Sequence, residues 1–190
     1  LMQGSGDGYF VLPYTIGDYL ADEIKNPRLP TDDPEFEKAE KEARERIDRL
    51  MNINGTTTPL AFHKELGKIM WNYGGMERNE EGLKKGLELV TELEEQFYKD
   101  LKLTGTTDSI NQPLERALRL ASSFEISRLM LRDALNRKES CGAHFRTEYQ
   151  TEDGEAQRND DEYMYVSAWE YKGDKQEPEL HKEELKYEHV

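Results

Sequence analysis

The sequence predicts a mainly α-helical protein, in which a three-helix bundle follows other helices and precedes a small irregular or β extension. Three observations support this fold class. Apolar residues recur at three- and four-residue spacing along most of the chain. Pro and Gly residues stand where these periodic segments start and end. Alternation with a period of two, which is typical of strands, occurs only after residue 139.

The first 24 residues predict a helix that is already under way at Leu1. No initiator Met stands at position 1, so we expect the chain to be part of a larger protein. Four glycines cost about 1 kcal/mol each relative to Ala in a helix, but they allow close approach by another backbone or a flat ligand. Two interpretations stay open: a helix packed against close neighbours, or a helix whose N-terminus faces a cofactor. The apolar residues are Tyr9, Phe10, Leu12, Ile16, Tyr19, Leu20 and Ile24.

A proline-rich linker, residues 26–34, separates this segment from the next helix. Asp33 is the expected N-cap and Pro34 the first helical residue, and the helix extends to about Asn52. A narrow apolar stripe runs from Phe36 to Met51, and Lys, Arg and Glu cover the remaining faces. Such a charge run predicts a solvated surface.

Three further helices form the predicted antiparallel bundle. The first starts at Pro59 behind a Thr58 cap and ends at Gly74-Gly75. The second starts behind an Asn79 cap and ends near Leu101. The third opens at Pro113 and ends near Lys138. The expected core residues are Leu60, Leu66, Ile69, Met70 and Tyr73 on the first helix, and Leu114, Leu118, Phe124 and Leu131 on the third. Trp71 and Trp169 are expected in the core or at an interface.

The chain changes character after Glu139. The compact loop Ser140–Arg146 bends at Gly142 and Ala143, and two interpretations of it stay open: it hydrogen-bonds neighbouring backbone, or it contacts a partner or cofactor domain. Residues 163–171 alternate and predict a strand, Gly173-Asp174 predicts a turn, and residues 180–190 are a candidate partner strand.

Composition excludes several function classes. The chain has 40 acidic and 26 basic residues and a net charge of -14, which argues against nucleic acid and anionic membrane surfaces as partners. No apolar run approaches the roughly 20 residues that cross a bilayer, so direct membrane insertion is not expected. The single Cys141 excludes an internal disulfide and fits a reducing cytoplasm.

No complete catalytic or metal site is visible. The sequence contains no CxxC, HExxH or Walker A motif and no GxGxxG after a strand. His63 is expected on the surface, and His181 and His189 lie in an acidic tail that favours adventitious metal binding only. Cys141 lacks an activating set, although His144 follows three residues later. We therefore expect no catalytic residue and no metal ligand in this chain.

Three segments together resemble one known family. Residues 139–146, ESCGAHFR, resemble the E-S-R-G-A-H-x-R loop of succinate dehydrogenase and fumarate reductase flavoprotein subunits, with Cys141 in place of Arg. Residues 131–137 resemble the L-x-x-A-L-x-R that ends the preceding helix, and residues 66–71 resemble the family's L-x-x-x-M-W. Residues 1–4 resemble the continuation of a flavin-contacting segment, and residues 9–14 resemble a Bacteroides-type branch.

The resemblance implies that the chain is the C-terminal part of such a subunit. Residues 1–54 would be the tail of the FAD-binding domain, residues 55–138 a spectrin-repeat-like helical bundle, and residues 139–190 the motif loop and C-terminal extension. Leu1 would contact the flavin. His144 and Arg146 match the motif loop without a catalytic role.

The resemblance also implies a cofactor, binding partners and a cellular location. FAD would be bound in the parent protein and not in this fragment, which would be inactive by itself. The partners would be the FAD-binding and capping domains and an iron–sulfur subunit, in the cytoplasm at the inner face of the cytoplasmic membrane. The alternative from the residues alone is a free-standing acidic helical protein-interaction module.

Overall fold

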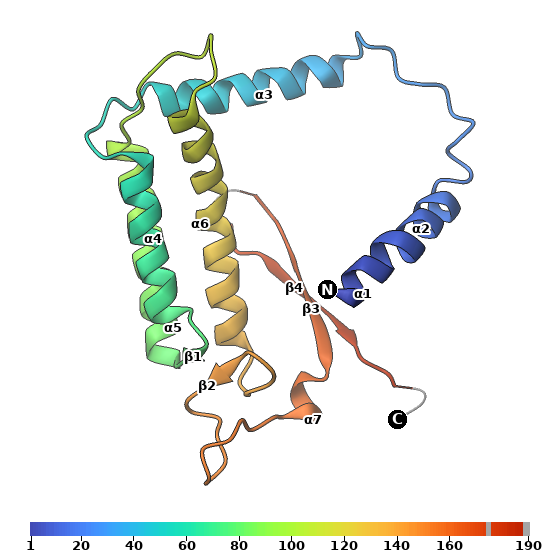
Figure 1. The fold of residues 1–190 in the computed structure, drawn as a ribbon, viewed down its shortest axis with the longest axis vertical. Coiled ribbons are helices and arrows are strands. Elements are labelled where there is room, and N and C mark those ends of the chain that lie inside the picture. Colours follow the sequence, from blue (N-terminus) through green and yellow to red (C-terminus); the bar gives the residue numbers. More distant parts are fainter. Residues whose placement is uncertain (174–175, 188–190) are drawn as a thin grey trace. The chain divides into compact units, whose positions relative to one another are not determined.

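The computed structural model of the chain describes residues 1–173 and 176–187 (Figure 1). The chain divides into two compact units, residues 1–44 and residues 45–190. Helices dominate, and only short strands occur in the described residues, which confirms the predicted mainly α class.

The first unit begins with one nearly continuous helical segment, formed by α1 (Met2–Gly6), a π-helical stretch η1 (Asp7–Val11) and α2 (Leu12–Tyr19). The predicted helix is confirmed, although it ends five residues before Ile24. Its apolar side chains are exposed, with Tyr9 79% and Phe10 71% accessible. A Cβ built on any of its four glycines meets nothing within 4 Å in the described residues. The two interpretations of these glycines therefore both stay open.

Helix α3 (Pro34–Met51) starts where the linker predicts. The Glu35 N–H donates to Oδ1 of Asp33 over 3.0 Å, which is the expected cap. Exposed ion pairs, such as that between Arg44 and Glu40, lie along the surface of the helix. Residues 45–51 of this helix belong to the second unit, where Leu50 is buried.

Three helices of the second unit form the predicted bundle: α4 (Pro59–Tyr73), α5 (Glu80–Asp100) and α6 (Gln112–Asn136) (Figure 1). Side-chain caps begin all three. Thr58 accepts from the Ala61 N–H over 3.3 Å, Asn79 from the Gly82 N–H over 2.7 Å, and Asn111 from the Leu114 N–H over 2.9 Å. The α6 cap is Asn111, so Pro113 occupies the second helical position rather than the first.

Phe97 of α5 lies at the centre of the core. Its ring packs edge-on against Phe62 of α4 at 5.5 Å and tilted against Phe124 of α6 at 5.4 Å. Two expectations about the core are wrong. Leu60 is 47% exposed, and Phe62 is buried in its place; Leu118 is only partly buried, whereas Leu120 is 2% exposed. Trp71 is 83% exposed and is not a core residue.

Gly55 allows the chain to pass directly over the end of α5. Its N–H donates to the Leu101 carbonyl over 2.9 Å, and a Cβ at this position would lie 2.1 Å from the Asp100 carbonyl carbon. The Asp100 carboxylate accepts from the Thr56 N–H over 2.8 Å and from the hydroxyls of Thr56 and Thr57. These hydrogen bonds hold the pKa of Asp100 below its ordinary value, the Thr57 hydroxyl contributing most.

Three of the four described strands lie in the C-terminal extension, and β1 lies between α4 and α5. Strand β1 (Glu77–Arg78) pairs in parallel with β2 (Phe145–Arg146), and β3 (Tyr165–Glu170) pairs antiparallel with β4 (Glu179–Glu184), with Trp169 opposite Leu180. The predicted hairpin is confirmed with narrower bounds, because Tyr163 ends a short helix, α7 (Asp160–Tyr163), and β4 ends at Glu184. Asp174 of the predicted turn lies outside the described residues.

Side-chain contacts connect this hairpin to α6. The Trp169 indole N–H donates to Oδ1 of Asp133 over 2.8 Å, and the Asn136 amide lies 3.4 Å from the Tyr165 hydroxyl. Tyr165 is 8% exposed. Trp169 is therefore anchored by hydrogen bonding to a helix rather than enclosed in the core.

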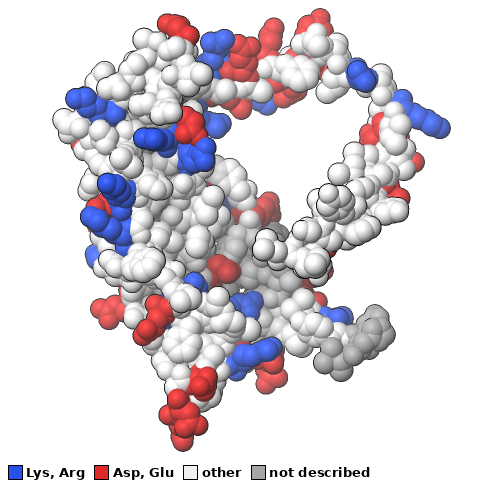
Figure 2. Space-filling view, viewed as in Figure 1, with Lys and Arg blue, Asp and Glu red and all other residues white. Residues whose placement is uncertain are grey.

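On the one face that Figure 2 draws, charged side chains are spread rather than gathered into one basic surface. On the face drawn in Figure 2, blue and red side chains lie interspersed over the helices, and the loop between β2 and α7 carries red ones. None of the helices in the described part of the chain combines the length and apolar character that a bilayer crossing requires.

Candidate functional site

Arg146 caps the C-terminal end of α6 from inside the protein. Its side chain is 1% exposed, and Nη1 donates to the Ala134 carbonyl over 2.8 Å and to the Leu135 carbonyl over 3.4 Å. The last carbonyls of a helix have no partner within the helix, so a buried guanidinium satisfies groups that would otherwise be costly to bury. Its Nε donates to Glu148 over 3.2 Å, which balances the charge.

Ser140 closes the loop that carries Arg146 into this position. Its hydroxyl accepts from the Arg146 N–H over 2.8 Å and donates to the Arg146 carbonyl over 3.1 Å. The Cys141 N–H donates to the His144 carbonyl over 2.8 Å, and the turn between them uses Gly142 at a φ of 58°. These residues therefore make the backbone hydrogen bonds of the first interpretation, and the second interpretation, a contact with a partner or cofactor domain, stays a prediction.

Glu139 and Arg137 join the end of α6 to the C-terminal extension. Glu139 is 2% exposed; its Oε1 accepts from Nη1 of Arg137 over 2.7 Å and its Oε2 from the Asn159 N–H over 2.8 Å. Arg137 also donates to the carbonyls of Tyr163 and Tyr165 at 3.2 and 3.1 Å. Both oxygens of the buried Glu139 carboxylate are thus hydrogen-bonded, which is the condition under which burying a charge is tolerated.

His144 bridges the two halves of this region. Nη1 of Arg78 lies 2.9 Å from Nδ1 of His144, and Nε2 of His144 lies 3.0 Å from the Arg137 carbonyl. A guanidinium only donates and a carbonyl only accepts. The ring must therefore carry its proton on Nε2 and be neutral.

Electrostatics agree with a neutral ring. Burial lowers the pKa of His144 below its ordinary value of 6.5, and the charges of Arg78, Arg146 and Arg137 lower it further, while the bond to the Arg137 carbonyl acts in the opposite direction. Burial also lowers the pKa of Arg78, with a further contribution from Arg146 that Asp133 opposes. The His144 ring thus serves as an acceptor for Arg78 and adds no further positive charge beside the three arginines.

A hollow of about 400 Å³ opens beside these groups, between the end of α4 and the end of α6. Arginine side chains and apolar groups share its lining, which consists of Gly74, Arg78, Met130, Asp133, Ala134, Arg137, Cys141 and His144. The Cys141 thiol is partly buried there.

The hydrogen bonds of this region position the backbone of the motif loop and stabilise its charged side chains. Acid–base or nucleophilic chemistry needs a nucleophile, a base within hydrogen-bond reach and a group that orients the base. In the described hydrogen bonds, both nitrogens of His144 are engaged, by Arg78 and the Arg137 carbonyl, and Cys141 is joined to His144 through backbone groups.

The other residues named from the sequence lie away from this region. Leu1 is fully exposed at the start of α1, and its predicted flavin contact stays a prediction. His63 is exposed on α4, as expected. His189 lies outside the described residues.

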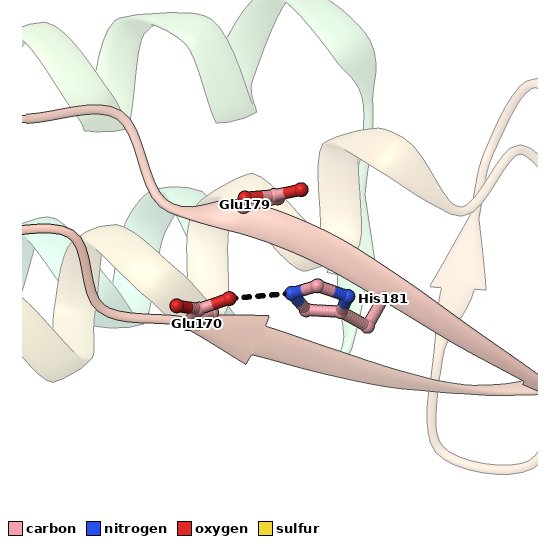
Figure 3. A group of neighbouring side chains, drawn as sticks. All are labelled: Glu170, Glu179 and His181. Atoms are coloured by element: carbon pink, nitrogen blue, oxygen red, sulfur yellow. Dashed lines mark hydrogen bonds and ion pairs between the residues drawn. The ribbon is translucent and has the colours of Figure 1, made fainter.

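His181 lies with Glu170 and Glu179 on the hairpin (Figure 3), where Nε2 is 2.7 Å from Glu170. All three side chains are exposed. The Lys172 ammonium lies 2.9 Å from Glu170 and 2.7 Å from Glu179, so a cation of the chain itself already bridges the two carboxylates.

Sequence reasoning singled out His144 and Arg146, included Arg137 and Glu139 only as members of the family motifs, and missed Arg78. Arg78 comes from the connection between α4 and α5, 66 residues before His144. An arginine three residues after Gly75, between two predicted helices, was the only local signal. Glu139 was visible as part of the motif, but nothing local showed that it is buried.

Comparison with known proteins places these residues in a family. Residues 63–190 match the family model described as fumarate reductase flavoprotein C-term. Among curated relatives, an uncharacterized FAD-dependent oxidoreductase of Methanocaldococcus jannaschii is 32% identical over 111 residues, 58% of this chain and 20% of the relative. The succinate dehydrogenase flavoprotein subunit of Bacillus subtilis is 28% identical over 145 residues, 76% of this chain and 24% of the relative.

Solved structures share the fold. A quinol-fumarate reductase with menaquinol molecules superposes with a TM-score of 0.70 at 23% identity, over 85% of this chain and 27% of that one. The adenylylsulfate reductase of Archaeoglobus fulgidus superposes with a TM-score of 0.68 at 20% identity, over 90% of this chain and 27% of that one. At these identities the likeness concerns the fold alone.

The match covers the bundle from α4 onward, the motif loop and the extension, and the chain spans about a fifth to a quarter of the length of the curated relatives named above. The buried Ser140, Arg146 and Glu139 all lie within the matched residues. The chain therefore belongs to the fumarate reductase flavoprotein C-terminal family.

Proposed function

We propose that this chain is the C-terminal helical part of a flavoprotein subunit that interconverts fumarate and succinate, and that it acts there as a structural and assembly domain. The observation that carries the proposal is family membership over residues 63–190. Relatives named succinate dehydrogenase and fumarate reductase flavoprotein subunits support the wider activity. The direction of the reaction and the Bacteroides-type branch stay open.

FAD belongs to the parent protein in this proposal, and this chain binds none by itself. FAD supplies hydride and electron transfer when it is bound. Leu1 lies against the flavin, and the exposed apolar residues of α1 and α2 support contact with the FAD-binding and capping domains. An iron–sulfur subunit exchanges electrons with the flavoprotein, in the cytoplasm at the inner face of the membrane. The proposed division remains 1–54, 55–138 and 139–190.

The hydrogen bonds of the motif loop support a structural role. Arg146 and His144 direct their polar atoms at the helix end and at Arg78, and Ser140 bonds both backbone groups of Arg146. A loop whose donors are occupied in this way positions elements of the fold. We expect its loss to loosen the C-terminal extension first and to affect the flavin chemistry indirectly.

The test uses the full-length subunit and its partners. His144→Ala and Arg146→Ala are each compared with Arg119→Ala, an exposed arginine of α6 that pairs with Glu115. We expect the first two variants to lose co-purification with the iron–sulfur subunit or domain packing, while residual dye-linked fumarate reduction persists in proportion to bound FAD. Normal FAD content and assembly with vanished turnover would show that the loop is catalytic.

A second experiment addresses the 190-residue chain. We expect it to be colourless and inactive in a titration with FAD followed by flavin fluorescence and calorimetry. Specific binding at micromolar FAD would contradict this. The coding sequence upstream of Leu1 distinguishes our proposal from the alternative, a free-standing acidic interaction module. Our proposal requires that sequence to encode an Arg-bearing segment and, farther upstream, a dinucleotide-binding fingerprint.

A further inference from the structure

Arg78 is a half-buried cation whose hydrogen-bond partners are all neutral. Its Nε donates to the Gly75 carbonyl and its Nη1 to the His144 ring. Within residues 1–173 and 176–187, Nη2 and the second N–H of Nη1 have no hydrogen-bond partner, and no carboxylate lies within ion-pair distance of the guanidinium, although the charge of Asp133 acts on it from farther away. The two other arginines of the cluster do have carboxylates: Arg137 pairs with Glu139 and Arg146 with Glu148.

We propose that the hollow beside Arg78 binds a small organic monocarboxylate, held by the Arg78 guanidinium. A guanidinium with two adjacent donors matches a carboxylate in a bidentate geometry, and an arginine in partial burial gains most from such a partner. The volume of about 400 Å³ lies within the range of small-molecule sites, which combine an apolar lining with a few convergent polar groups.

The lining favours a ligand with one negative charge over a dianion. Arg137 is neutralised by Glu139, and Asp133 contributes a carboxylate to the same wall. Because Asp133 opposes added negative charge beside Arg78, a dianion such as phosphate is disfavoured more than a single carboxylate. Met130, Ala134 and Gly74 supply apolar surface for a short hydrocarbon body. The inference goes beyond the proposed function and does not depend on it, because it stands on the hollow alone.

Cys141 makes the test direct, because it is the single cysteine of the chain and lines the hollow. The rate at which neutral N-ethylmaleimide alkylates it is measured on the unaltered 190-residue chain at constant ionic strength. The probes are butyrate, its uncharged analogue butyramide, inorganic phosphate and chloride. With a Kd on the order of 1 mM, about 10 mM butyrate slows alkylation about tenfold, and the effect saturates.

Butyramide and chloride are expected to leave the rate unchanged. Equal protection by butyramide or chloride, or no saturable protection by butyrate, overturns the proposal. Protection by phosphate that equals or exceeds that by butyrate overturns the restriction to a monocarboxylate. These comparisons use the unaltered chain, so they decide the proposal even where a variant fails to fold.

Variants then locate the site. Arg78→Gln is expected to abolish the protection of Cys141 by butyrate. Arg78→Lys keeps the positive charge but removes the paired N–H donors of the guanidinium, and is expected to weaken the protection at least about threefold. Arg119→Gln is the matched control, since it removes an exposed arginine from the same bundle. Folding of each variant is checked by circular dichroism. A folded Arg78→Gln chain that butyrate still protects contradicts the assignment.

Discussion

Nη1 of Arg78 lies 2.9 Å from Nδ1 of His144, and this contact joins the connection after α4 to the loop after α6. It fixes the proton of the ring on Nε2, where the Arg137 carbonyl accepts it. Beside it, β1 and β2 pair in register, with Arg78 opposite Arg146. One neutral imidazole therefore joins the Arg78 side chain to the backbone at the end of α6.

The stability of the chain should depend on the protonation of His144. Its folded-state pKa is below 6.5, so the unfolded chain binds the proton more readily. The contribution is therefore complete above about pH 6.5 and is lost as the pH falls toward the folded-state pKa. His144→Gln, which stays neutral, should flatten the dependence of the denaturation midpoint between about pH 7.5 and pH 5.5. His63→Gln, on the exposed face of α4, is the control and should keep the slope of the parent chain.

Removing the Arg146 side chain should destabilise the bundle strongly. Arg146→Met leaves the carbonyls of Ala134 and Leu135 without their donor inside the protein, and we expect a loss of about 3–5 kcal/mol in the free energy of unfolding. Arg119→Met removes an exposed ion pair and should change stability by about 0.5 kcal/mol or less. Urea denaturation measures both. Similar values for the two variants would refute the capping role of Arg146.

Two leucines of α6 separate the observed core from the expected one. Leu120→Ala removes most of a side chain that is 2% exposed and should lower the free energy of unfolding by roughly 2–5 kcal/mol. Leu118→Ala affects a partly buried neighbour of the core and should cost about half as much. Chemical denaturation of both variants, with m-values compared, decides the order. A larger loss of stability in Leu118→Ala than in Leu120→Ala would support the core that the sequence periodicity predicts and contradict the burial in the structure.

Two glycines of the second unit should respond oppositely to alanine. Gly55→Ala places a methyl group 2.1 Å from the Asp100 carbonyl carbon and should cost at least about 2 kcal/mol, because backbone must move. Gly67→Ala, in the middle of α4 with nothing within 4 Å of the new Cβ, should stabilise by about 0.5–1 kcal/mol. Thermal unfolding distinguishes them by the sign of the change in Tm. Stabilisation by Gly55→Ala would show that the passage over α5 is loose.

The positions of the helices were readable from the sequence because their signals are local. A cap acts within three residues, as Thr58 and Asn79 do, and prolines stop a helix wherever they stand. The motif loop was readable for the same reason, since its residues are contiguous. The alternation of residues 165–170 predicted the first strand of the hairpin, and only its limits moved.

What only the tertiary structure decided involves residues that are distant in sequence. A stripe on a helix spans several neighbouring positions, and which of Leu118 and Leu120 is enclosed depends on where α4 and α5 lie. The burial of Arg146, its approach to the end of α6, and the pairing of His144 with Arg78 across 66 residues follow from the docking of segments. Local sequence patterns determine helices and strands because the partners of backbone hydrogen bonds and of helix caps lie close by in the sequence. Whether a buried side chain is neutral or charged depends instead on the groups that folding brings around it.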